Sequence, residues 1–336
     1  EPRSRGGAPR ARATWRAADP GRSAPPTLLE VSEVRTPRLG RGDVLVRVEA
    51  AAVHPGDCFI MSGEPYMVRL VYGLRRPRHG IPGRDLGGVV AAVGSDVTAL
   101  HPGDRVFGWT AAGSLAEYSC VPAENLALVP DRVPVAEAAA VPTSGMTALQ
   151  AMREVASVQA GQSVLITGAS GGVGSFAVQI AKALGAEVTG VCSTRNVDLV
   201  RALGADHVVD YTTTDVTRTG RRYDVILDNV EALPLAAMRR VLTDTGTLIP
   251  NNGRGGRWIG PLGRIVKARL RSGFTRQRLR PFLSVERRRY LVDLADLLAT
   301  GEVTPAIGRT YPLDEAADAL SHVASGHARG KVVITL

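Results

Sequence analysis

Short stretches of alternating apolar and polar residues occupy the first part of the chain. One of them reads Val44-Leu45-Val46-Arg47-Val48, and an apolar stretch follows at residues 87–93. Turns rich in Gly, Pro and Asp separate these stretches. A period of two between such turns is typical of short β-strands. We therefore predict a β-rich domain over residues 17–134.

From Val135 onward the pattern changes to Ala-rich helical segments and then to strands that alternate with helices. This alternation predicts a doubly wound α/β domain with a parallel sheet, the Rossmann type, over residues 135–300. The expected strands are 164–167, 188–191, 207–209, 224–227 and 247–249, and the expected helices include 196–203 and 235–241.

The two ends of the chain differ in character. Residues 307–311 and 331–336 are strand-like and flank a helical pattern at 313–325, so we expect residues 301–336 to return to the β-rich domain. The simplest architecture is then a β-rich domain interrupted by the nucleotide-binding domain, with the functional cleft between them. Residues 1–16 are rich in Arg, Gly and Pro, and we expect a disordered basic leader there.

A glycine-rich turn joins the first expected strand of the Rossmann domain to a helix. It reads Thr-Gly-Ala-Ser-Gly-Gly-Val-Gly from Thr167 to Gly174, and apolar residues at helical spacing follow it. Backbone N–H groups at the start of such a helix bind a pyrophosphate. A tight turn without a ligand is the alternative, but the flanking strand and helix favour the cofactor. The predicted cofactor contacts here are Gly168, Ser170, Gly171, Gly172 and Val173.

The second strand of this domain ends without an acidic residue. An NAD site has Asp or Glu there to accept hydrogen bonds from the ribose 2′-hydroxyl, whereas this chain has Ser193, Thr194 and Arg195. Two hydroxyls and a guanidinium suit a 2′-phosphate, which favours NADPH over NADH. Ser193 and Thr194 could equally cap the next helix.

Composition narrows the function further. The formal net charge of +9 is concentrated in one segment, from Arg254 to Arg289, which carries eleven Arg and one Lys against Glu286 alone. Such a segment is typical of a solvated helical face, although it could attract an anionic substrate or nucleic acid.

Three cysteines are too few for a disulfide framework or a four-cysteine zinc lobe, so a reducing cytoplasm is expected. No apolar run approaches the ~20 residues of a membrane helix.

In their order along the chain, several modest motifs resemble the medium-chain dehydrogenase/reductase superfamily, from about Leu39 to the C-terminus. The resemblance is to its zinc-free quinone oxidoreductases and NADPH-dependent alkene reductases, and it implies a GroES-like fold for the β-rich domain. Short-chain dehydrogenases share the glycine motif, but they need a Tyr-x-x-x-Lys that this chain lacks. The motifs that carry the resemblance lie at residues 82–88, 103–106, 113–118, 168–174, 203–207 and 330–333.

Departures from the family pattern concern the metal. Zinc-dependent relatives have Cys where this chain has His54, and His where it has Arg84. Because arginine cannot replace an imidazole as a zinc ligand, we expect no metal. A private zinc site from His54, Cys58, His79 and Asp85 is the alternative. Quinone-reductase relatives usually have Asn at the His54 position.

The resemblance also implies roles for residues at matching positions. His54 and Tyr66 would meet the substrate carbonyl or position the nicotinamide, and Phe59 and Tyr66 would line the substrate pocket. Thr147 would touch the nicotinamide ribose or phosphate, and Tyr211 would pack beside the 2′-phosphate. The remaining implied cofactor contacts are Asn251 and Asn252 after the last expected strand, and Lys331 on the returning C-terminal segment.

These observations predict an NADPH-dependent, zinc-independent reductase of a quinone or of an α,β-unsaturated carbonyl compound. One alternative is an enoyl reductase that acts on a carrier-bound or biosynthetic intermediate. A second is an NADPH-binding protein that uses its basic segment on nucleic acid. We expect a small-molecule substrate, a homodimer, and no membrane or nucleic-acid partner.

Overall fold

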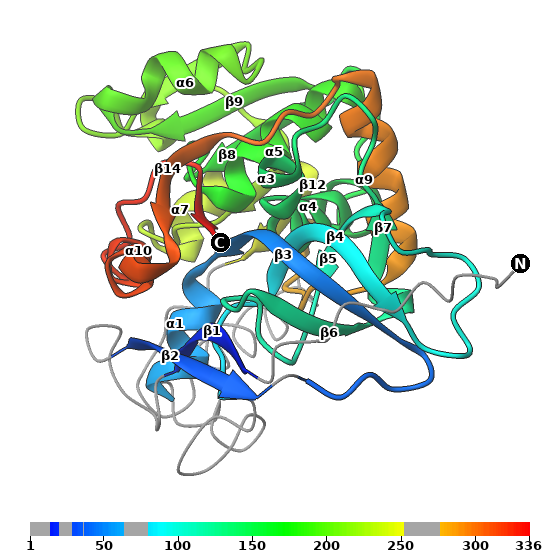
Figure 1. Cartoon of the computed structure of the whole chain (residues 1–336). Helices are drawn as coiled ribbons and strands as arrows, with labels where there is room; N and C mark the ends of the chain where they lie inside the picture. The colour runs from blue at the N-terminus through cyan, green and yellow to red at the C-terminus, as the bar shows by residue number, and fades with distance from the viewer. Residues whose placement is uncertain (1–13, 20–28, 36, 64–79, 252–275) are drawn as a thin grey trace, which may run out of the picture.

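The computed structural model describes residues 14–19, 29–35, 37–63, 80–251 and 276–336. Two sheets dominate these residues (Figure 1), a parallel one in the upper half of the view and a mixed one below it. They confirm the predicted fold class, a β-rich domain combined with a Rossmann domain.

Six parallel strands form the Rossmann sheet, in the order β10-β9-β8-β11-β12-β13. This is the doubly wound order 3-2-1-4-5-6. The order in which successive strands are added reverses between β8 and β11, and folds of this type bind ligands at that point. The strands are β8 (Ser163–Thr167), β9 (Glu187–Cys192), β10 (His207–Asp210), β11 (Tyr223–Asp228), β12 (Leu242–Pro250) and β13 (Arg278–Leu279).

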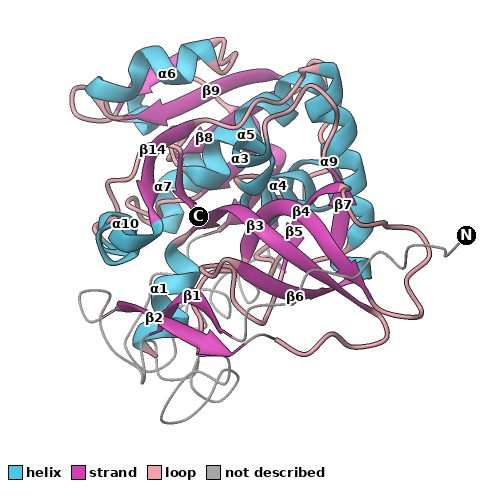
Figure 2. Ribbon diagram, in the orientation of Figure 1, coloured by secondary structure: helices cyan, strands magenta, loops and turns pink. Residues whose placement is uncertain are grey.

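Helices cover both faces of this sheet, which explains the nearly continuous apolar character of β8 and β9. Helices α5 and α6 share one core with Val164 and Ile166, and α7 packs in another core with Leu165, whose side chain points to the opposite face; Figure 2 shows α6 beside β9 at the top of the view. The helices of this domain are α3 (Val135–Ala139), α4 (Pro142–Leu149), the π-helix η3 (Gln150–Val155), α5 (Gly172–Ala183), α6 (Val197–Ala202), α7 (Leu235–Arg240) and α9 (Arg288–Thr300), with short 3-10 turns η4 (Thr194–Asn196) and η5 (Val216–Arg218).

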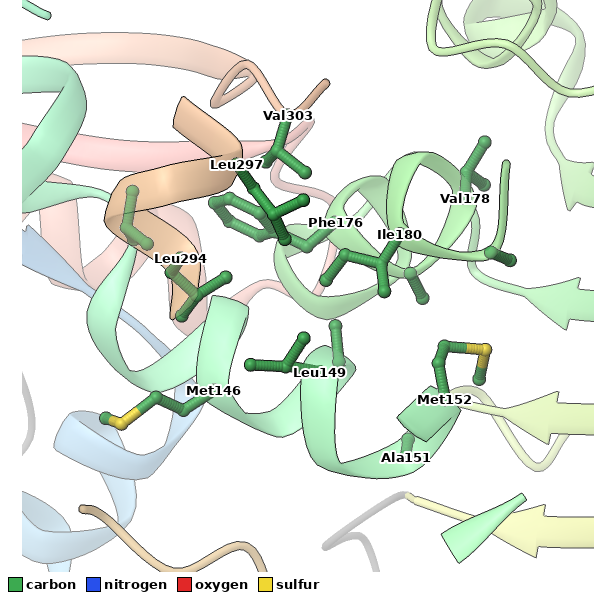
Figure 3. Close-up of a cluster of buried hydrophobic side chains, with 14 of the residues drawn as sticks. Met146, Leu149, Ala151, Met152, Phe176, Val178, Ile180, Leu294, Leu297 and Val303 are labelled. Atoms are coloured by element: carbon green, nitrogen blue, oxygen red, sulfur yellow. The ribbon is translucent and has the colours of Figure 1, made fainter. Parts of the chain in front are cut away.

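The largest hydrophobic core lies where α4, η3, α5 and α9 meet (Figure 3). Met146, Phe176 and Leu294 are each fully buried in it. Fully burying one such side chain contributes about 1.5–3 kcal/mol. This core fixes α5 in place, and with it the glycine-rich turn that leads into that helix.

The second sheet contains the β-rich domain and the end of the chain. Its order is β14-β15-β3-β4-β5-β7, and β6 also pairs with β3. The C-terminal strand β15 runs antiparallel to β3, with Val333 opposite Ala52. Its strands are β3 (Asp43–Val53), β4 (Asp85–Val93), β5 (Arg105–Trp109), β6 (Tyr118–Pro122), β7 (Leu126–Leu128), β14 (Ile307–Pro312) and β15 (Lys331–Thr335).

Helices α1 (Pro55–Ser62) and α10 (Ala316–Ala324) pack together beside this sheet, and α10 follows a 3-10 turn, η6 (Leu313–Glu315). A further 3-10 turn, η2 (Ala123–Asn125), joins β6 to β7. The Cys58 thiol contacts the Leu320 carbonyl at 3.5 Å, which ties α1 to α10. Residues 301–336 thus contribute two strands and a helix to the first domain, beside α1.

The structure differs from the expected boundaries near the N-terminus. Strand β1 (Thr14–Asp19) pairs antiparallel with β2 (Glu30–Arg35), and Thr14 lies opposite Arg35. Residues 14–16 of the expected leader therefore belong to a sheet, because Thr and Trp favour strands and the backbone of these residues pairs with β2. Residues 1–13 lie outside the described residues.

Candidate functional site

A cleft of about 1560 Å³ lies between the two domains. It reaches from α1 in the first domain, along the glycine-rich turn, to the carboxyl ends of β9 and β11. This is the switch point of the sheet, where the fold is expected to bind a ligand. Among the sequence-predicted site residues, those that line the cleft are His54, Phe59, Gly168, Ser170, Gly171, Gly172, Val173, Ser193, Arg195, Tyr211, Asn251 and Lys331.

The glycine-rich turn leaves the start of α5 available to an anion. Gly171 is the N-cap and provides no side-chain capping bond to the first turn of the helix. Gly168 has a φ of 60°, which glycine adopts without strain, and a Cβ on Gly174 would lie 2.1 Å from the Gly168 carbonyl oxygen. The N–H groups and the positive end of the helix dipole fit a pyrophosphate.

The C-terminal segment closes one side of this turn. The Gly330 amide donates to the Ser170 carbonyl at 2.7 Å, and Gly171 pairs with Gly330 as an isolated bridge. Further along the cleft, the Arg195 guanidinium donates to the His327 carbonyl at 3.2 Å. The Rossmann domain and the returning chain therefore meet directly across the cleft.

Of the three predicted cofactor contacts at the end of β9, two line the cleft and one does not. Ser193 and Arg195 line the cleft, together with Tyr211, which is largely exposed. The Thr194 hydroxyl instead donates to the Asp210 carboxylate at 2.6 Å and does not line the cleft. This bond lowers the pKa of Asp210. Ser193 is the N-cap of η4 but makes no side-chain capping bond, so the capping alternative is not what the structure shows.

His54 is the N-cap residue of α1. Its Nδ1 accepts a hydrogen bond from the Gly56 amide at 3.0 Å, while its own amide donates to Asp57 Oδ2 at 2.8 Å. A neutral ring that accepts at Nδ1 carries its proton on Nε2. Nε2 is buried, lies 3.6 Å from Asp57 Oδ2, and has no hydrogen-bond partner among the described residues. Burial raises the pKa of Asp57, with His54 opposing the effect.

Arg84, at the position of a zinc ligand in the relatives, makes an ion pair that links the two domains. Its guanidinium lies 2.6 Å from the Glu286 carboxylate. Burial raises the pKa of Glu286, and Arg84 opposes this shift. Within the described ranges, no three His, Cys, Asp or Glu side chains form a group that could hold a metal ion. His79, one member of the alternative zinc site, lies outside them.

Lys331 is buried in the cleft wall. Its ammonium group lies 3.2 Å from Asp85 Oδ2 and 3.2 Å from the Ser144 hydroxyl. Asp85 Oδ1 in turn accepts from both the amide and the hydroxyl of Thr143, at the start of α4. The lysine that was expected to contact the cofactor is therefore held by a carboxylate of the first domain.

Besides Thr194, three other predicted site residues are not among those that line the cleft in the structure. The Thr147 hydroxyl donates to the Thr143 carbonyl at 2.7 Å inside α4, so Thr147 does not line the cleft. Thr143 and Ser144, one turn earlier, line it instead. Tyr66 and Asn252 lie outside the described residues. Asn251 lies at the cleft, where its amide donates to Asn229 at 2.7 Å.

Sequence reasoning missed several residues that line the cleft. Asp228 ends β11 beside the switch point and Asn229 follows it. The rule that ligands bind at the carboxyl ends of parallel strands could have found both. Asn196 is buried beneath the end of β9, and its amide donates to Ser170 at 3.0 Å and to Ser193 at 3.3 Å. No local motif indicates this bridge.

The basic segment is only partly described. Arg289 pairs with Glu154 at 2.8 Å, and the Arg288 guanidinium donates to the Leu126 carbonyl at 3.1 Å. These contacts join α9 to η3 and to β7, so two of the arginines of this segment make contacts within the molecule. Residues 252–275 lie outside the described residues.

In the part of the chain that the structure covers, no helix has the length and apolar character needed to span a bilayer.

Comparison with known proteins agrees with this architecture. Family models for the alcohol dehydrogenase GroES-like domain and for zinc-binding dehydrogenases match residues 40–131 and 203–334. The quinone-oxidoreductase homolog of Spinacia oleracea, a chloroplastic protein by its name, is 33% identical over 90% of this chain and 92% of its own length. The chloroplastic NADPH-dependent alkenal/one oxidoreductase of Arabidopsis thaliana is 31% identical over 90% of this chain and 74% of its own.

A solved structure gives the same result. The quinone oxidoreductase from Coxiella burnetii superposes with a TM-score of 0.82 and 27% identity, over 96% of this chain and 99% of that one. The sequence relatives, the two family models and the fold agree on one assignment, and the cleft fits a nicotinamide dinucleotide. The chain belongs to the medium-chain dehydrogenase/reductase superfamily of oxidoreductases, in its quinone oxidoreductase branch.

Proposed function

We propose that the protein is an NADPH-dependent, zinc-independent reductase of quinones or of α,β-unsaturated carbonyl compounds. The observation that carries the proposal is the composition of the cleft from end to end. It has Ser193 and Arg195 at the end of β9, a helix N-terminus in the middle, and Phe59 and His54 at the other end. A guanidinium and a hydroxyl, with no carboxylate at residues 192–195, favour a 2′-phosphate.

The chemistry follows from the groups beside His54. When bound, the nicotinamide supplies the hydride. A carbonyl substrate then develops negative charge on its oxygen, and hydrogen-bond donors stabilise that charge. His54 lines the cleft, and we assign its Nε2–H as such a donor, since its Nδ1 is occupied by the Gly56 amide. Nε2 is buried beside Asp57, so the ring has to turn for this N–H to reach a substrate. A dedicated acid is not required for the last step, because water can supply the final proton.

Arg84 supports zinc independence. It stands at a ligand position of the zinc-dependent relatives, and it is paired with Glu286. A guanidinium has no lone pair to offer a metal, so the carbonyl oxygen must be met by hydrogen bonds rather than by a Lewis acid.

A substrate screen tests this proposal. NADPH oxidation is followed with quinones, enals, enones and an enoyl thioester, beside saturated aldehydes as the negative set. We expect turnover of at least one quinone or enone and slower turnover with NADH. A His101→Ala variant, on an exposed loop outside the cleft, is the matched control and should behave as the unaltered protein. Turnover of saturated aldehydes alone would refute the proposed substrate class.

A further inference from the structure

Asn196 is a buried amide between two parts of the cleft. It is 6% exposed and is the last residue of η4, the 3-10 turn that follows β9. Its Nδ2 donates to the hydroxyl oxygen of Ser170, in the glycine-rich turn, at 3.0 Å and to that of Ser193 at 3.3 Å. One side chain therefore holds the hydroxyl groups of two residues that line the cleft.

These bonds decide which way the two hydroxyls can donate. A serine hydroxyl has one hydrogen to donate and two lone pairs that accept. Because Asn196 donates to both oxygens, the hydrogens of Ser170 and Ser193 remain free for an acceptor in the cleft. Phosphate oxygens accept such bonds, and hydrogen bonds to a charged acceptor are about twice as strong as neutral ones.

The other end of the same amide supports a role toward a ligand. Asn196 Oδ1 is buried and has no hydrogen-bond partner among the described residues. An amide retained for stability alone would have both ends satisfied, as Gln179 does, whose Nε2 donates to the Ser175 and Thr304 carbonyls while its Oε1 accepts from the Thr304 amide. Asn196 thus orients two hydroxyls although its own carbonyl oxygen is buried without a hydrogen bond, which is unfavourable for stability.

We propose that Asn196 is a positioning residue for cofactor selectivity, and that it acts through Ser193 on the 2′-phosphate that distinguishes NADPH from NADH. This inference rests on the proposed function, because it requires the 2′-phosphate to bind at the end of β9. It goes beyond the predicted contacts because Asn196 need not touch the phosphate. Its effect is to keep the Ser193 hydrogen directed into the cleft.

A double-mutant cycle tests the inference. The dissociation constants of NADPH and NADH are measured for Asn196→Ala, Ser193→Ala and the double variant. Each single variant should lower the ratio of NADPH affinity to NADH affinity about tenfold, the loss of one charge-assisted hydrogen bond. The ratio is the quantity compared, because Asn196→Ala also releases Ser170, which faces the part of the cofactor that NADH and NADPH share. The double variant should also lose only about tenfold, since both changes remove the same contact. Independent contacts would multiply to about a hundredfold and would overturn the inference.

Two further variants separate positioning from folding. Asn196→Ala should leave the unfolding midpoint nearly unchanged, because it also removes the unpartnered Oδ1. Gln179→Ala, the matched buried amide, should lower the midpoint and leave the NADPH-to-NADH ratio unchanged. Asn196→Asp keeps the shape of the side chain, but its carboxylate accepts hydrogen bonds from the serines, so it should weaken NADPH more than Asn196→Ala does.

The outcomes distinguish this inference from the function on which it rests. If the unaltered protein binds NADPH and NADH equally, the proposed cofactor selectivity fails, and the inference fails with it. If the unaltered protein prefers NADPH but Asn196→Ala keeps that preference, or weakens both cofactors equally, the inference alone is refuted.

Discussion

The Lys331 ammonium lies 3.2 Å from the Asp85 carboxylate, and both side chains are almost completely buried. Lys331 begins the C-terminal strand, whereas Asp85 begins β4 and also accepts two hydrogen bonds from Thr143 in α4. Three segments that are distant in sequence thus meet at one carboxylate in the cleft wall. The pair lies within the first domain, and its hydrogen bonds with Thr143 and Ser144 join that domain to α4 at the place where the cofactor is expected.

Removing one member of this pair should destabilise the protein strongly. In Lys331→Met the Asp85 charge stays buried without its counter-ion, which typically costs about 3–5 kcal/mol of unfolding free energy. Urea unfolding measures the loss. Lys331→Met combined with Asp85→Asn should recover much of it, because the amide is neutral and can still accept from Thr143.

The exposed pair between Arg201 and Asp198 is the matched control. Arg201→Met should change the unfolding free energy little, since exposed ion pairs contribute little. Equal effects of Lys331→Met and Arg201→Met would contradict the view that the buried pair stabilises the folded protein.

Cofactor preference should reverse when the charge at the end of β9 is reversed. Ser193→Asp with Arg195→Ala removes a charge-assisted phosphate contact and adds a carboxylate that repels the 2′-phosphate. We expect NADPH affinity to fall about a hundredfold, while NADH affinity changes far less. Fluorescence titration with both cofactors measures this. Equal affinity of the unaltered protein for the two cofactors would refute the assignment.

Metal removal should leave the enzyme active. Arg84 at a ligand position, and three cysteines in place of a four-cysteine zinc lobe, predict no stoichiometric zinc in the purified protein. Elemental analysis checks the zinc content, and the rate of NADPH oxidation is compared before and after incubation with a strong chelator. One tightly bound zinc per chain, with activity lost when it is removed, would overturn the zinc-independent mechanism.

His54 provides the sharpest test of the chemistry. If its Nε2–H meets the developing negative charge, His54→Ala should lower kcat about a hundredfold at saturating NADPH, comparable with the loss of one oxyanion donor. If the ring only positions the cofactor, the KM for NADPH should rise and kcat should change by no more than a few-fold.

His54→Asn is the control for that comparison. Asn is a favoured N-cap, so it can replace the capping bond to Gly56, and its amide can also donate to a carbonyl. It should keep much of the rate and most of the stability. A His54→Asn variant as slow as His54→Ala, with unaltered stability, would mean that the imidazole has a role that an amide donor cannot fill.

Local sequence patterns were sufficient for the central strands of the Rossmann sheet and for the cofactor turn. The apolar runs at β8, β9 and β11 predicted those strands to within one residue, because strands covered on both faces have nearly continuous apolar sequences. The glycines from Gly168 to Gly174 predicted the turn before α5, since only residues without a Cβ allow its close approach. These are short-range properties, encoded by neighbouring residues.

Contacts between distant residues were decided by the tertiary structure alone. Asp85 meets Lys331 across 246 positions, and Asn196 reaches Ser170 across 26, and no local pattern indicates either contact. Thr147 matched the family position but lies inside α4, where its hydroxyl bonds to its own helix. The sequence by itself determined most of the strands and helices of the Rossmann domain and the cofactor class that fits it. The packing of the two domains decided which side chains face the cleft, because that depends on how separate elements meet.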